Sequence, residues 1–193
     1  MKLEASTRIL AVAGICAASL IALVVSEGFA RESGQEITLP MEAVDPRAIL
    51  SGHYVQLNFT QRLEATAACP PDGDWDWVAL RPENDIYVAA GGAVSRDEAE
   101  RVGPLPVKGT FTCSPPTPPQ EGIEGMPGWL TLNLGVDRFH INQADAERIE
   151  RVLRDQRAAE ETRAFAVLSV GRDGRARLRA LKIDGERFEL RWL

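Results

Sequence analysis

The first pattern along the chain is an apolar run from Ile9 to Val25 that contains no charged residue. At about 1.5 Å per helical residue it would extend roughly 25 Å, close to the hydrocarbon thickness of a bilayer. The run is apolar on every side, which is not the pattern of a surface helix with one polar face. We therefore predict a single transmembrane helix over residues 9–26, preceded by a cytoplasmic N-terminus at residues 1–8.

The charges on either side of this run predict its orientation. Lys2 and Arg8 precede it and Glu27 follows it, so the positive-inside rule places residues 31–193 outside the cytoplasm. An alternative is a signal peptide cleaved near Ala30, because Gly28, Phe29 and Ala30 form a small-x-small triplet. Cleavage there would release a secreted protein. The length of the apolar run favours a retained anchor.

Beyond Arg31 the apolar positions change to a period of two, which is typical of half-buried strands. Val55, Leu57 and Phe59 alternate with polar residues in this way. Other expected strands lie at residues 36–44, 77–82, 85–90, 107–113 and from 129 onward. The C-terminus predicts a β-meander of residues 163–170, 175–183 and 186–193, with turns at 172–174 and 184–185.

One segment after the anchor has helical periodicity. From Asn142 to Ala159 an apolar stripe of Ile149, Val152 and Leu153 follows a capping residue. The fold class predicted is therefore α+β: a mainly antiparallel β domain with one soluble amphipathic helix, preceded by a single N-terminal transmembrane helix.

The charge of the chain argues against one class of partner. Its formal net charge is −6, whereas a nucleic-acid binder needs a basic face to neutralise phosphates, so we expect no nucleic acid partner. Arg175, Arg177 and Arg179 alternate on one strand. We interpret them as a solvated face, with a patch for an anionic partner as the alternative.

Export would place two cysteines in an oxidising compartment. Cys16 lies in the apolar run, which leaves Cys69 and Cys113 in the exported body. We expect a disulfide between them; the alternative is a pair of buried thiols.

From the sequence we assign no catalytic, cofactor-binding or metal-binding residue. His53 and His140 have no partner at metal-ligand spacing, and no nucleophile motif is present. The acidic loop with Asp72, Asp74 and Asp76 lacks the spacing of a calcium-binding loop, and we interpret it as an ordinary solvated loop.

One short segment carries a family resemblance. The residues "GHYVQLNF" at 52–59 resemble the signature of the bacterial GDYXXLXY family of membrane-anchored proteins, with the lead-in "VDPR" before them. His53 replaces the Asp of the signature and Phe59 replaces its final Tyr. The family-motif residues, to which the resemblance gives no role, are Asp45, Pro46, Arg47, Gly52, His53, Tyr54, Leu57 and Phe59.

The resemblance implies an inner-membrane protein that faces the periplasm, and it implies no reaction. We expect a non-enzymatic binding or accessory subunit that works with another inner-membrane or envelope protein. The alternative is an envelope enzyme, a hydrolase, whose site is assembled from residues far apart in the sequence.

Overall fold

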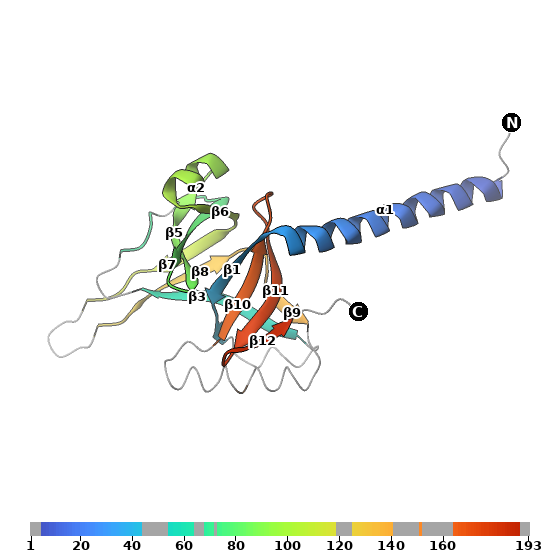
Figure 1. Cartoon of the computed structure of the whole chain (residues 1–193). Coiled ribbons are helices and arrows are strands. Elements are labelled where there is room, and N and C mark those ends of the chain that lie inside the picture. The colour runs from blue at the N-terminus through green and yellow to red at the C-terminus, as the bar shows by residue number, and fades with distance from the viewer. Residues whose placement is uncertain are drawn as a thin grey trace.

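The apolar run forms part of one long helix, α1 (Ala5–Ser33), which projects away from the rest of the chain (Figure 1). The computed structural model describes residues 5–43, 54–63, 68–71, 73–118, 125–140, 151 and 164–189. Within α1, residues Thr7–Ser33 are long and apolar enough to cross a membrane, and none of the tested window is buried. The predicted long apolar N-terminal helix is therefore confirmed.

Within the described ranges, the remaining elements are mainly strands, arranged in three antiparallel sheets. The first has the order β1 (Gln35–Pro40), β10 (Ala164–Val170), β11 (Ala176–Ile183), β12 (Glu186–Glu189). The second has the order β2 (Glu42–Ala43), β3 (Tyr54–Leu63), β8 (Gly128–Asn133), β7 (Thr110–Ser114), and β9 (Arg138–His140) also pairs with β3. The third consists of β5 (Ile86–Ala93), β4 (Trp77–Glu83) and β6 (Leu105–Lys108). The predicted α+β class is confirmed.

One hydrophobic core joins the three sheets. Its fully buried members come from β1, β3, β4, β6, β8, β10, β11 and the residue that follows β1. The largest are Ile37, Leu39, Met41, Phe59, Leu80, Leu130, Leu168 and Leu181. The alternation of apolar residues seen in the sequence turns one face of each strand toward this core. The C-terminal meander and its two turns are confirmed as β10, β11 and β12.

Several expectations differ from the structure. The strand expected at 36–44 is two strands, β1 and β2, in different sheets. A single strand predicted at 107–113 is two strands, β6 and β7, in different sheets. Gly109, with a φ of 156°, lies between them and allows the chain to change direction. The turn between β4 and β5 is at Asn84 and Asp85, one residue later than expected, and Asn84 adopts a φ of 55°.

A short helix that the sequence analysis did not predict, α2 (Arg96–Val102), covers part of the third sheet. Ser95 caps it by accepting a hydrogen bond from the Glu98 amide, and Ala99 packs onto buried alanines of the sheet. Apart from Arg151, the helix predicted at 142–159 lies outside the described residues. The same holds for Asp45, Pro46, Arg47, Gly52 and His53.

Candidate functional site

The described part of the family signature lies on β3, the central strand of the second sheet. The strand pairs with β9 at Tyr54–Gln56, with β2 at Leu57 and Asn58, and with β8 from Phe59 onward. The side chains of Leu57 and Phe59 are 6% and 1% exposed. These two motif positions therefore contribute to the core. Tyr54 is opposite His140 in the strand register.

A buried glutamine on the same strand, Gln61, is bonded to the third sheet. Gln61 donates a hydrogen bond from Nε2 to the Tyr87 carbonyl at 3.3 Å, and its Oε1 accepts one from the Ala89 amide at 3.0 Å. Both bonds satisfy polar groups that burial would otherwise leave unpaired. Gln61 thus fixes β3 against β5, and the sequence analysis missed this residue.

The two cysteines outside α1 are joined in the structure. Cys69 and Cys113 form a disulfide with an S–S distance of 1.98 Å and a Cα–Cα distance of 5.8 Å. The bridge ties the segment around Cys69 to β7. Cys16 is free and exposed on α1.

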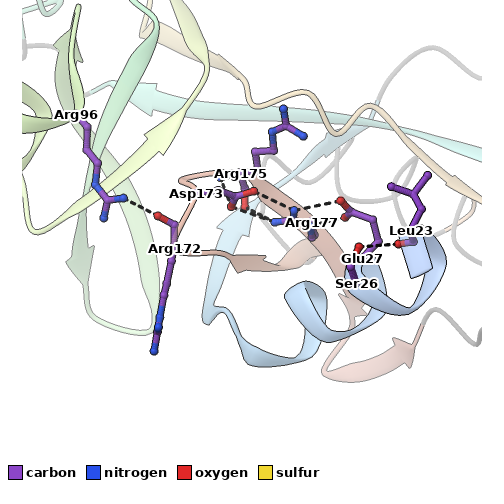
Figure 2. A network of polar contacts seen from close by, with 8 residues as sticks. All are labelled: Leu23, Ser26, Glu27, Arg96, Arg172, Asp173, Arg175 and Arg177. Carbon is purple, nitrogen blue, oxygen red and sulfur yellow. Dashed lines mark hydrogen bonds and ion pairs between the residues drawn. The ribbon is translucent and has the colours of Figure 1, made fainter. Parts of the chain in front are cut away.

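The densest polar arrangement among the described residues is at the base of α1, and we call it the anchor junction: Glu27, Arg31, Glu36, Asp173, Arg177, Arg179 and Arg187. Arg177 on β11 bonds two acids of this group (Figure 2). The Arg177 guanidinium contacts Glu27 Oε2 on α1 at 2.8 Å and Asp173 Oδ2 in the preceding turn at 3.0 Å. One largely buried cation thus joins the helix to the β10–β11 hairpin.

The electrostatics of this group follow from that geometry. Hydrogen bonds donated by Arg177 hold the pKa of Asp173 at about 2, well below its ordinary value. The pKa of Arg177 is raised, first by Asp173 and then by Glu27. All of these interactions favour the charged forms at neutral pH. The Arg177 side chain is only 13% exposed, so its interpretation as part of a solvated face is wrong.

A second set of contacts fixes the base of the helix to the first sheet. Arg31 on α1 donates a hydrogen bond to the Arg179 carbonyl at 3.0 Å. Glu36 on β1 contacts Arg187 at 2.9 Å and Arg179 at 3.0 Å. Hydrogen bonding to Arg187 lowers the pKa of Glu36 and raises that of Arg187.

Close backbone packing completes the anchor junction. Gly34 separates α1 from β1, and a Cβ at this position would meet the Ser169 hydroxyl and the Val170 carbonyl oxygen, the latter at 2.8 Å. Only glycine fits between the helix end and β10. The helix therefore passes into the first sheet without a linker.

The described residues contain no group of His, Cys, Asp and Glu side chains that could hold a metal ion. The anchor junction has a structural role: it holds an exposed apolar helix in one orientation relative to a β-sheet body. A β-sheet protein whose N-terminal helix is long and apolar enough to cross a membrane is the class that the fold and this site define.

Comparison with known proteins then assigns the family. Residues 16–181 match the family described as GDYXXLXY protein, and the chain belongs to that family. The matched region includes Glu27, Gly34 and Arg177, so both sides of the anchor junction lie inside it. No curated protein matches the chain, and no solved structure does.

Proposed function

We propose that this protein is a single-pass inner-membrane protein whose body, residues 31–193, lies in the periplasm. We further propose that it is a non-enzymatic binding or accessory subunit for another inner-membrane or envelope protein. The observation that carries the proposal is the bond between Glu27 on α1 and Arg177 on β11. It makes the anchor and the body one structural unit.

A retained anchor is supported by the same contacts. The triplet Gly28–Ala30 lies inside α1, and Gly28 and Ala30 are partly buried. Glu27 before it and Arg31 after it are both bonded to β11. A protease needs its substrate in an extended form, so cleavage here would require these bonds to break and the last turns of α1 to unwind.

The periplasmic side is supported by two independent features. Lys2 and Arg8 favour a cytoplasmic N-terminus. The Cys69–Cys113 disulfide is stable in an oxidising compartment and not in a reducing one.

A rigid anchored body suits an accessory role. Confinement to the membrane raises the effective concentration of the body toward a partner in the same membrane, without any additional contact. A fixed orientation also presents the same surface to that partner at all times. Among the described residues, β7 and β8 extend away from α1 in Figure 1.

The test is crosslinking in intact membranes followed by affinity capture of the full chain from detergent. The matched control carries α1 on an unrelated soluble domain, which separates partners of the body from proteins that bind the helix alone. We expect one envelope protein to be recovered reproducibly with the full chain and not with the control. Recovery of the same proteins by both chains would contradict a binding role for the body.

A further inference from the structure

The anchor junction also shows which surface of the body faces the lipid. The apolar run ends at Val25, so Glu27 lies where the helix leaves the hydrocarbon region. Because Arg177 contacts Glu27 at 2.8 Å, the start of β11 lies at this same level. The side of β11 from which α1 departs is therefore the side nearest the bilayer.

An exposed aromatic residue on the helix supports this level independently. Phe29 is 68% exposed and follows Glu27 by two residues. At about 100° per residue the two side chains lie roughly 200° apart around the helix, so Phe29 points away from the body when Glu27 points toward it. Phe is one of the apolar residues that helices bury at the boundary between lipid and water.

One arginine at this level has a free guanidinium. Arg175 lies two residues before Arg177, so about 7 Å of extended chain separates them. It is exposed, and within the described part of the chain its guanidinium makes no hydrogen bond or ion pair, as Figure 2 also shows. The positive charge of Arg175 is near enough to the Glu27 carboxylate to favour its ionised form.

The backbone that carries Arg175 is held firmly. Its amide donates to Asp173 Oδ1 at 3.1 Å, and its carbonyl accepts from the Gly171 amide at 3.1 Å. The rest of the turn is held from the third sheet, since Arg96 donates to the Arg172 carbonyl at 2.5 Å and Lys108 donates its amide hydrogen to the Gly174 carbonyl at 2.8 Å. Only the side chain of Arg175 is left to move.

We propose that Arg175 binds the phosphodiester of an anionic lipid at the membrane surface where α1 emerges. The two nearby carboxylates, Glu27 and Asp173, are bonded to Arg177, which leaves the Arg175 guanidinium available to a phosphate. A guanidinium matches a phosphate group through paired N–H donors. This inference rests on the proposed membrane-anchored function.

The experiment uses the full chain reconstituted in phosphatidylcholine vesicles. Spin-labelled phosphatidylglycerol and spin-labelled phosphatidylcholine report which lipid is held at the protein surface, from the fraction of each label whose motion is restricted. The test variant is Arg175→Gln. The matched control is Lys182→Gln, which removes the same charge at the far end of β11, where Lys182 is exposed.

We expect Arg175→Gln to reduce the preference for phosphatidylglycerol by about five-fold, the effect of one cation near a lipid surface. Lys182→Gln should leave the preference unchanged. Equal effects of the two substitutions, or no effect of Arg175→Gln, would overturn the proposal. Failure of the proposed membrane anchor is a separate result: the chain would then be released from membranes by alkaline carbonate.

Discussion

Arg177 is the residue on which the anchor junction most depends, because one guanidinium serves carboxylates from α1 and from the β10–β11 turn. Arg177→Gln leaves both carboxylates without their cation. We expect it to lower the free energy of unfolding of the body by about 1 kcal/mol, since these acids are partly exposed and screened. Chemical denaturation of the detergent-solubilised chain, followed by near-ultraviolet circular dichroism, measures this change.

The matched control is Arg81→Gln. Arg81 contacts Glu83 at 3.1 Å, but both side chains are at least half exposed, so its loss should change the unfolding free energy by less than about 0.5 kcal/mol. Equal effects of the two substitutions would show that the anchor junction adds nothing beyond an ordinary surface ion pair.

The pKa of Asp173 predicts how acid affects this site. Asp173 titrates at about 2 in the folded protein, below its ordinary value of 3.8. A depressed pKa means that its contribution is complete above about pH 4 and is lost as the pH falls toward about 2. The difference in melting temperature between the wild-type chain and Asp173→Asn should therefore be constant near neutral pH and disappear near pH 2. A difference that is already lost at pH 5 would contradict this assignment.

Gly34 tests the packing between helix and sheet. An added Cβ would lie 2.8 Å from the Val170 carbonyl oxygen, so Gly34→Ala should destabilise the body by about 1–3 kcal/mol. The control is Gly28→Ala in α1, where an added Cβ meets nothing within 4 Å. This change should be neutral or slightly stabilising, because alanine favours helix more than glycine does. A neutral Gly34→Ala in thermal unfolding would show that the helix end is not packed as described.

For single residues, burial could be predicted from the sequence, but long-range partners could not. The burial of Leu57 and Phe59 follows from their alternation with polar neighbours, and it was predicted. The partner of Arg177 was not, because Glu27 is 150 residues away along the chain and no local pattern links them. The hydrogen bonds of Gln61 depend in the same way on tertiary contacts.

At the scale of elements, periodicity predicted the strands more reliably than their grouping. The meander of β10, β11 and β12 is local, with short turns, and its pattern was sufficient. The strand predicted at 107–113 was divided between two sheets because Gly109 turns the chain, which alternation alone does not show. Helix α2 is only seven residues long and was missed, although Ser95 and Glu98 have the spacing of a capping box.

The disulfide is the element-scale feature with the largest expected effect on stability. Cys69 and Cys113 are 44 residues apart, and closing such a loop stabilises the folded state by about 4 kcal/mol in the chain-entropy model. Replacing both residues with alanine should lower the unfolding free energy by about 2–5 kcal/mol. Denaturant unfolding measures the loss. An unchanged midpoint, or equal alkylation of the wild-type cysteines with and without reductant, would contradict the bridge.

At the scale of the whole molecule, the anchor and the body form one unit. No linker separates α1 from β1, and α1 contacts both β10 and β11. The family match from residue 16 to residue 181 spans both parts. The long apolar helix could be predicted from the sequence, whereas its fixed attachment to the first sheet could not, because that attachment is made by residues from opposite ends of the chain.

The most direct test of this account is the intact mass of the protein extracted from bacterial membranes. We predict a mass that includes residues 9–30, because Glu27 and Arg31 on either side of the Gly28–Ala30 triplet are both bonded to β11. A membrane-extracted or released chain whose N-terminus is Arg31 would contradict it.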